Sequence, residues 1–200
     1  MIIIIIAITT VISIISFGNR ELMDKLKFNA WYVKHENQYW RLISYALVHA
    51  DWIHLIINMY VFYSFGRIVE VLYKAHFGDI GTFYFIILYV GGAFFATMYD
   101  YAKQKDNALY NAVGASGAVA AVTFASIILY PQGRIYLFFL PIPIPSTIFG
   151  ILYLIYSWQM AKRGRDNIGH YAHFWGAVFG IVFTVVLKPA LALQFIYNIF

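Results

Sequence analysis

Residues 113–130 read VGASGAVAAVTFASIILY, an apolar run that contains no charged side chain. The run is close to the roughly 20 residues that a helix needs to cross about 30 Å of hydrocarbon. Near its beginning stands a serine between two glycines, in the sequence Gly114-Ala115-Ser116-Gly117. The run therefore predicts a membrane-crossing helix with a hydroxyl at a depth where polar groups are costly and mark function.

Five more apolar runs of comparable length lie on either side of this one. Together the runs predict an all-α membrane protein, a six-helix transmembrane bundle that forms a single domain over residues 1–200. The first run lacks a basic segment at its start and a small-residue cleavage site at its end, so it predicts an anchor helix rather than a signal peptide. Pro141, Pro143 and Pro145 interrupt the fourth of these five. The five runs are Ile2–Phe17, Trp52–Val71, Ile80–Tyr99, Ile135–Met160 and Ala172–Leu187.

The composition agrees with a membrane protein. Soluble domains carry roughly a quarter charged residues, whereas here 12% are charged and 62% are hydrophobic. The net charge of +5 comes from short Lys and Arg clusters between the apolar runs, which is typical of membrane loops and argues against a nucleic-acid partner.

The connection from Gly18 to Tyr39 is amphipathic and rich in Trp and Tyr, which favours a place in the membrane interface. Because the chain has no cysteine, thiolate nucleophiles, Cys-ligated zinc and disulfides are excluded.

Three groups of polar residues stand near the beginnings of the second, fourth and sixth runs. In an antiparallel serpentine of helices these runs enter the membrane from one face, so we expect the three groups at a similar depth. The first group is His49, His54 and Asn58. On a helix His54 and Asn58 share one face. Two interpretations stay open for this pair: donors aimed at one oxygen, or hydrogen bonds that hold helices together.

The second group is the serine between its glycines. A lone serine in a membrane helix usually bonds to its own backbone. Gly114 and Gly117 change this expectation because they remove bulk from around the Ser116 hydroxyl and let another backbone approach. A helix that begins here would also direct free N–H groups toward an anion.

The third group is centred on His173. Gly176 and Gly180 form a small-xxx-small pair suited to close helix packing, which would bring His173 near Ser116. A serine hydroxyl needs an adjacent base to become nucleophilic, and imidazole serves best at neutral pH. No acidic residue stands within the sixth run to orient the imidazole, and Asp166 belongs to a loop. The pattern therefore favours a Ser-His dyad over a triad.

In this order the motifs resemble those of the rhomboid intramembrane proteases, in their bacterial six-helix form. The resemblance covers nearly the whole chain, from about Trp40 to Gly180. The residues that carry it are Trp40-Arg41, His49, His54, Asn58, Gly114-Ala115-Ser116-Gly117 and Ala172-His173-x-x-Gly176.

The resemblance implies a serine endopeptidase that cleaves single-span membrane proteins in or near their transmembrane segment, in a lipid bilayer and without metal or cofactor. It makes Ser116 the nucleophile and His173 the general base. It also implies that Trp40 and Arg41 brace the loop after the first helix. The remaining support of the site, including the oxyanion hole, would come from His49, His54, Asn58, Gly114 and Gly117, with the backbone N–H of Ser116.

One position departs from the family pattern. Many members carry an aromatic residue four positions after the serine, where it stacks on the catalytic histidine, whereas this chain has Ala120. The sequence leaves open whether Tyr171, Phe174 or another ring holds the imidazole or whether the imidazole is held more loosely. It also leaves open whether Trp175 fills the space beside Ala120.

Three alternatives compete with the protease. A non-catalytic relative that binds transmembrane helices usually loses the serine or the histidine, and this chain keeps both. A metalloprotein built on His49, His54, His170 and His173 would lack the carboxylate that hydrolytic sites generally add. A small transporter would favour broken helices such as the proline-rich run.

The resemblance also implies an orientation. It places the active site on the extracytoplasmic side of a bacterial inner membrane and both ends of the chain in the cytoplasm. Four of the 14 Lys and Arg residues then lie on the cytoplasmic side and the other ten on the opposite side. The positive-inside rule predicts the opposite, with most Lys and Arg residues on the cytoplasmic side.

Overall fold

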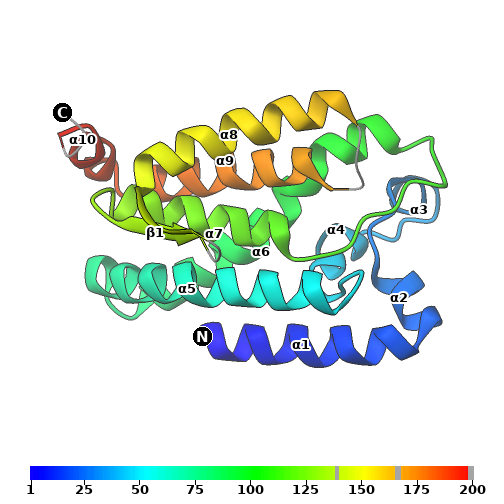
Figure 1. Ribbon diagram of the computed structural model, residues 1–200. Coiled ribbons are helices and arrows are strands. Elements are labelled where there is room, and N and C mark those ends of the chain that lie inside the picture. Colours follow the sequence, from blue (N-terminus) through cyan, green and yellow to red (C-terminus); the bar gives the residue numbers. More distant parts are fainter. Residues whose placement is uncertain (138–139, 165–167, 198–200) are drawn as a thin grey trace.

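The computed structural model describes residues 1–137, 140–164 and 168–197, most of which lie in helices (Figure 1). The apolar runs form the long helices, and short helices fill the connection after the first of them. In chain order the helices are α1 (Ile2–Gly18), α2 (Arg20–Leu26), α3 (Ala30–His35), α4 (Arg41–Ser44), the 3-10 turn η1 (Tyr45–Leu47), α5 (Trp52–Phe77), α6 (Ile80–Gln104), α7 (Ser116–Leu129), α8 (Ser146–Arg163), α9 (His170–Leu187) and α10 (Ala190–Tyr197).

Helix α7 is the core of the molecule. Every residue from Gly117 to Leu129 is buried, because α7 packs against α5, α6 and α9. Small residues allow this close approach. A side-chain carbon added at Gly92 of α6 would collide with Ala121, and one added at Gly180 of α9 would collide with the Ala121 carbonyl oxygen. At these positions the backbones of α6 and α9 lie directly against α7, because glycine has no side chain to separate them.

The prediction of one helical run over residues 135–160 is wrong in its first part. Residues Arg134–Leu137 and Leu140–Pro145 form an antiparallel hairpin, β1 and β2, in which Ile135 pairs with Ile144. Proline has no backbone N–H and clashes with the preceding helical turn, so the alternating prolines of residues 141–145 exclude a helix there. Helix α8 begins only after the last of them, at Ser146.

The connection after α1 is folded more fully than the sequence predicts. The buried Arg41 guanidinium donates from Nη1 to the carbonyl oxygens of Asp24 and Lys27 at 2.7 and 2.8 Å. Next to these, Phe28 exchanges two backbone hydrogen bonds with Ala112, at 2.9 and 3.0 Å. Arg41 thus braces the connection, as the resemblance implies, and Phe28 ties it to the segment that leads into α7.

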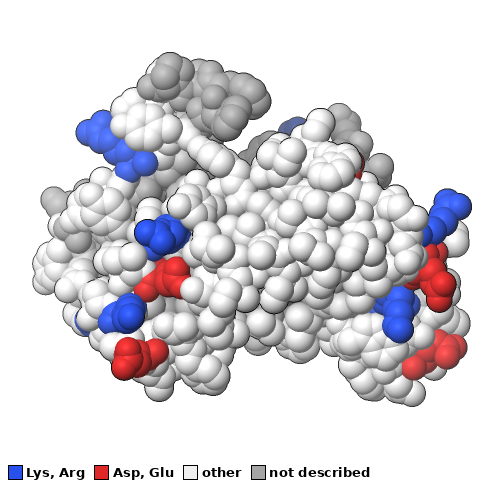
Figure 2. Space-filling view, turned by 90° about the horizontal axis from the view of Figure 1, so that it is seen from below, with Lys and Arg blue, Asp and Glu red and all other residues white. Residues whose placement is uncertain are grey.

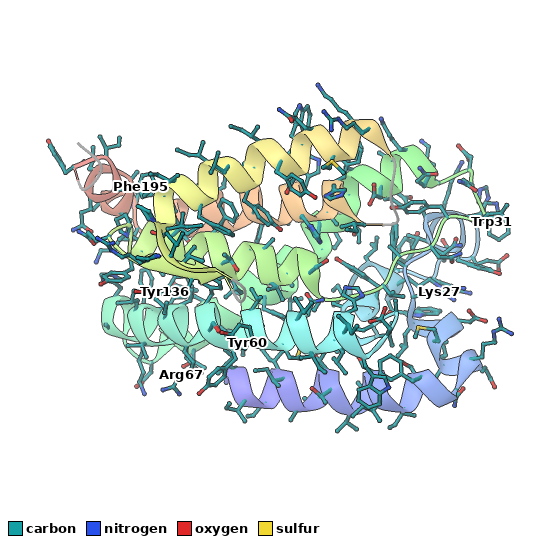
Figure 3. All side chains as sticks on the ribbon, viewed as in Figure 1. Lys27, Trp31, Tyr60, Arg67, Tyr136 and Phe195 are labelled. Carbon is teal, nitrogen blue, oxygen red and sulfur yellow. The ribbon has the colours of Figure 1, made fainter. Side chains whose placement is uncertain are left out.

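The outer surface suits a membrane. Within the described residues, α5, α6 and α9 are long and apolar enough to cross a membrane, while α1 and α7 are apolar but shorter. Figure 2 shows charged side chains gathered at the two ends of the molecule, with a wide uncharged band between them. In Figure 3, Lys27 and Trp31 lie at one end and Arg67 and Tyr136 near the other. Exposed apolar side chains cover the middle, among them Ile4, Ile8 and Val11 on α1, Ile56 and Ile57 on α5, and Ile151 and Leu152 on α8.

Candidate active site

The three polar groups lie where α5, α7 and α9 begin, on the side of the molecule where α2, α3 and α4 gather (Figure 1). Ser116 is the first residue of α7, and its side chain is half-buried. The first backbone N–H groups of a helix have no partner inside the helix, and they attract negative charge. Ser116 therefore carries its hydroxyl at a helix end that suits an anion.

Gly114 leads the chain into α7 and lies directly against the ring of His54. Its φ of +108° is one that side chains rarely adopt. A side-chain carbon at this position would stand only 2.5 Å from Cε1 of His54. The N–H of Gly114 donates to the carbonyl oxygen of Tyr45 at 3.0 Å, which fixes the turn. Both backbone conformation and space thus require glycine here, and the His54 imidazole comes to lie beside the start of α7.

His49 lies in the turn before α5 and is fully buried. Its Nε2 accepts the backbone N–H of Ala115 at 3.3 Å, and its Nδ1 lies 2.9 Å from Oγ of Ser13 on α1. The Ser13 hydroxyl donates to the carbonyl oxygen of Leu47 at 2.9 Å. These partners assign the proton of the neutral ring to Nδ1, which donates to Ser13. His49 therefore links α1 to the residue before Ser116. The sequence predicts His49 but gives no sign of Ser13.

His54 and Asn58 lie near the start of α5, one turn apart. The backbone N–H of His54 donates to the side chain of Asp51 at 2.7 Å, which caps α5. The His54 ring meets that of His49 edge-on, with 5.0 Å between centroids. Asn58 is buried, and its Nδ2 donates to the carbonyl oxygen of His54 at 2.9 Å. One of the two amide protons of Asn58 is thus engaged within its own helix, which the sequence does not predict.

The backbones on either side of Ser116 and His173 touch each other. A side-chain carbon added at Gly117 would lie 3.3 Å from the carbonyl oxygen of Ala172. One added at Gly176 would overlap the carbonyl group of Gly117. Both Ser116 and His173 have half-buried side chains at the first turns of their helices. The close packing that the glycines of α9 predict is therefore present at the residues that flank the candidate dyad.

The ring of His173 has aromatic neighbours on two elements. The Tyr153 ring on α8 stacks on it, with 6.3 Å between centroids and 29° between the planes. The ring of His170, one turn earlier on α9, meets it edge-on at 6.0 Å and 80°. Ala120 is buried with a methyl group only. Asp166, the acidic residue closest to this histidine in the sequence, lies outside the described residues.

Tyr171 and Phe174, which the sequence suggests beside the histidine, and Trp175, which it suggests beside Ala120, pack against other rings. Tyr171 stacks on Tyr99 with 4.0 Å between centroids, and Phe174 tilts against Trp158 at 5.0 Å. Trp175 lies parallel to Tyr99 at 6.5 Å. Of the possibilities left open by the sequence, the structure thus favours another ring, Tyr153. Its position on a different helix is not visible in any local sequence pattern.

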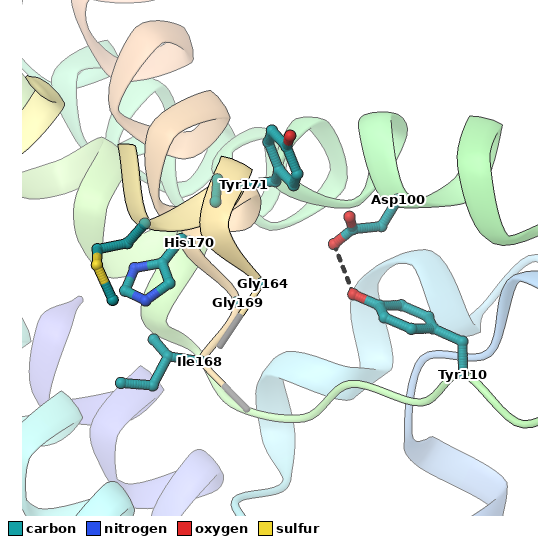
Figure 4. A pocket seen from close by; sticks show the side chains of 9 residues that line it. Asp100, Tyr110, Gly164, Ile168, Gly169, His170 and Tyr171 are labelled. Atoms are coloured by element: carbon teal, nitrogen blue, oxygen red, sulfur yellow. Dashed lines mark hydrogen bonds between the residues drawn. The ribbon is translucent and has the colours of Figure 1, made fainter. Parts of the chain in front are cut away.

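A small cavity of about 60 Å³ opens beside the start of α9 (Figure 4). The hydroxyl of Tyr110 donates to Asp100 there at 2.9 Å, and His170 forms part of the wall. Its lining includes neither Ser116 nor His173. The cavity is therefore next to the candidate dyad rather than part of it.

The histidines do not form one cluster suited to a metal. His49 adjoins His54, and His170 adjoins His173. Over residues 1–137, 140–164 and 168–197, no group of three or more His, Asp or Glu side chains gathers closely enough to hold a metal ion. The arrangement instead offers a hydroxyl, imidazole rings and a helix N-terminus. These are the kinds of group that acyl transfer requires.

The buried His49 predicts a pH dependence of stability. Burial, together with the neighbouring His54, lowers the pKa of His49 from 6.5 to about 3. Between these values the unfolded chain binds a proton that the folded protein does not, so stability falls as the pH drops, by at most about 1.4 kcal/mol per pH unit. We expect thermal unfolding of His49→Gln in detergent to depend less on pH between pH 7 and pH 5 than that of the wild type. Equal slopes for wild type and His49→Gln would contradict this account.

Comparison with known proteins identifies the family. The profile of the Rhomboid domain family matches residues 36–190. RHOMBOID-like protein 12, mitochondrial, of Arabidopsis thaliana is 29% identical over 156 residues, which cover 70% of this chain and 44% of that protein. The human presenilin-associated rhomboid-like protein, mitochondrial, is 31% identical over 137 residues, or 66% of this chain and 34% of that protein.

The yeast Rhomboid protein 1, mitochondrial, is 24% identical over 156 residues, which cover 76% of this chain and 43% of that protein. The chain thus spans less than half of the length of these curated relatives. The profile match includes all three polar groups of the candidate site and the helices α4 to α9 that position them. The chain belongs to the rhomboid family.

Proposed function

We propose that this protein is an intramembrane serine endopeptidase that hydrolyses peptide bonds in or near the transmembrane segment of single-span membrane proteins. One observation carries the proposal. The start of α7, with Ser116 as its first residue, lies between the His49–His54 pair on one side and the first turns of α9 on the other. Nucleophile, base and anion-binding groups would all be needed at this place for acyl transfer.

In the proposed reaction Oγ of Ser116 attacks the carbonyl carbon of the scissile peptide bond, and His173 takes the hydroxyl proton. The carbonyl oxygen becomes an oxyanion in a tetrahedral intermediate. When the C–N bond breaks, the imidazolium of His173 gives its proton to the leaving amine. Water then attacks the acyl-enzyme with His173 again as base, which releases the carboxylate product and restores the serine.

The oxyanion would be stabilised at the start of α7. The backbone N–H of Ser116 belongs to the free first turn of the helix. The His54 imidazole lies against Gly114, two residues before the nucleophile. Asn58 uses one amide proton for the His54 carbonyl oxygen, and its second amide proton is the donor that we assign to the oxyanion. His49 would act through the Ala115 N–H, which it holds, rather than by touching substrate.

The site would lie below the membrane surface. We propose that α1, α5, α6, α7, α8 and α9 form one six-helix transmembrane domain over residues 1–200. The 14 residues of α7 rise by about 21 Å and the 26 residues of α5 by about 39 Å. Because α7 is surrounded by longer helices (Figure 1), its first residue is set back from their ends. Polar groups at such a depth are tolerable where they line water, which hydrolysis also requires.

For orientation we keep the topology that the family resemblance implies, with the ends of α5, α7 and α9 near the candidate site facing away from the cytoplasm. Many of the Lys and Arg residues on that side belong to the folded connection from α2 to α4, where Arg41 is buried. Arg20, Lys25 and Lys34 of the same connection are exposed, so the positive-inside rule still opposes this topology, which rests on the family resemblance alone. The relatives are named as mitochondrial and give no support to a bacterial membrane, on which the proposal does not depend.

Replacing the nucleophile tests the reaction itself. We expect Ser116→Ala and His173→Ala each to lower cleavage of a model single-span substrate by at least about 10³-fold, and the double variant to be hardly worse, because the two residues act as a unit. Labelling by a fluorophosphonate probe should vanish in Ser116→Ala. Ser126→Ala on the same helix is the matched control, since that hydroxyl only donates to the Thr123 carbonyl oxygen. A folded wild type that is neither labelled nor active would favour a non-catalytic binder of transmembrane helices.

The oxyanion assignment predicts a separation of kinetic constants. His54→Ala and Asn58→Ala should each lower kcat by about 10²–10³ with little change in KM, because the donors act mainly in the transition state. Ser64 lies further along α5, and its hydroxyl donates to the Tyr60 carbonyl oxygen. Ser64→Ala is therefore the control and should leave kcat and KM unchanged. If the His54 and Asn58 variants raised KM alone, both residues would be binding or packing groups.

The topology is tested by reporter fusions in a bacterial inner membrane. A reporter fused after residue 200 should be active in the cytoplasm, and one inserted at the exposed Asn107, between α6 and α7, should be active on the opposite face. The two fusions control each other. A reversed pattern would overturn the orientation and leave the Ser116–His173 chemistry untouched.

A further inference from the structure

The clearest feature that the proposed reaction does not use is the aromatic ring of Tyr153. It belongs to α8, which supplies no residue to the dyad or to the oxyanion site. Its plane nevertheless lies within 29° of the His173 imidazole, at 6.3 Å between centroids. Both values fall in the range of attractive stacked aromatic pairs.

Tyr153 is itself held from several sides. Phe124 of α7 tilts against it with 5.5 Å between ring centroids, and Phe149, one turn earlier on α8, does so at 5.8 Å. A ring packed between two such neighbours has little freedom to rotate, so it presents a fixed surface to the imidazole.

The residues around Tyr153 explain why a ring from α8 reaches the histidine. Ala120 of α7 and Ala177 of α9 are both buried in the cluster against which Tyr153 packs. Their methyl groups take up little space, and the Tyr153 ring packs against this cluster from the third helix. Ala120, four residues after Ser116, has no ring to stack on the imidazole, whereas Tyr153 has one.

Support of this kind matters because the imidazole must keep one orientation to take the Ser116 proton. In a triad a carboxylate bonds the far nitrogen of the imidazole and fixes its orientation. A ring stacked on the face of the imidazole also limits its rotation about the side-chain bonds.

We infer that Tyr153 is the positioning residue of the proposed dyad, and that its ring, stacked on His173 from α8, holds the imidazole in the orientation that accepts the Ser116 proton. The inference rests on the proposed function for the identity of the base. The contact between the two rings does not depend on that function. In this role Tyr153 acts through His173 and exchanges no proton itself, so its loss should slow the chemical step and leave binding almost unchanged.

Kinetics of two substitutions test this role. Tyr153→Leu removes the ring, and we expect kcat to fall by about 10- to 100-fold with KM nearly unchanged, the size of effect that a misplaced catalytic group produces. Tyr153→Phe keeps the ring and should stay within a few-fold of the wild type. Tyr63→Leu, an exposed tyrosine on α5, is the matched control and should behave as wild type. A folded Tyr153→Leu with wild-type kcat, or a Tyr153→Phe as slow as Tyr153→Leu, would overturn the inference.

A spectroscopic measurement separates this inference from the proposed function. The chain has six histidines, so the ring protons of His173 can be assigned in an isotope-labelled sample by comparison with His173→Gln. A stacked ring shifts these protons upfield, and the shift should persist in Tyr153→Phe and vanish in Tyr153→Leu. If Tyr153→Leu does not fold, the wild type and Tyr153→Phe still test the inference. Unshifted ring protons of His173 in either protein would overturn it.

Failure of the proposed function would look different. In that case the folded wild type would neither cleave the substrate nor react with the fluorophosphonate, while the upfield shift of the His173 protons would remain and the kinetic role of Tyr153 would be lost with the enzyme activity. Cleavage by the wild type together with unshifted His173 protons would remove the positioning role and leave the protease intact.

Discussion

The backbones of α7 and α9 meet at Gly117 and Gly176, where neither helix has a side chain to keep them apart. The relation between the two halves of the candidate dyad follows from this contact. It sets the distance between the first turns of the two helices, and so between the segments that carry Ser116 and His173. The same contact recurs one turn deeper, where Gly180 lies against the carbonyl oxygen of Ala121. Two contacts along one line fix both the distance and the rotation of the helices.

The start of α7 is fixed a second time by the loops. His49 holds the Ala115 N–H and is itself joined to Ser13 of α1. On the other side of the same segment, Phe28 pairs with Ala112. These hydrogen bonds satisfy backbone groups that would otherwise be buried without partners, which is costly in apolar surroundings. The short helices from α2 to α4 therefore anchor the chain immediately before Ser116, although none of them contributes a residue to the dyad.

The parts of this structure that the sequence predicts are those with a local cause. The long helices follow from apolar runs, and the place of Ser116 near the beginning of one of them follows from the run over residues 113–130. The strands β1 and β2 also have a local cause, because alternating prolines exclude a helix. The prediction of a helix there followed the overall apolarity of the run instead. Tyr153 and Ser13 could not be found in this way. Each acts on a residue of another helix, so its role depends on how the helices pack and leaves no trace in spacing or periodicity. Asn58 is intermediate: its position follows from helical spacing, but its bond to the His54 carbonyl oxygen does not.

The complete burial of α7 has a consequence for variation of this protein. The exposed face of an outer helix such as α1 has no tightly packed protein neighbours. One apolar residue can therefore replace another there with little effect on stability. On α7 each added methyl group would press directly on α5, α6 or α9, whose backbones already lie in contact with it. Acceptable substitutions in the sequence should therefore be unevenly distributed. The few that α7 tolerates should be exchanges among small residues, while the exposed face of α1 should vary freely among the larger aliphatic residues.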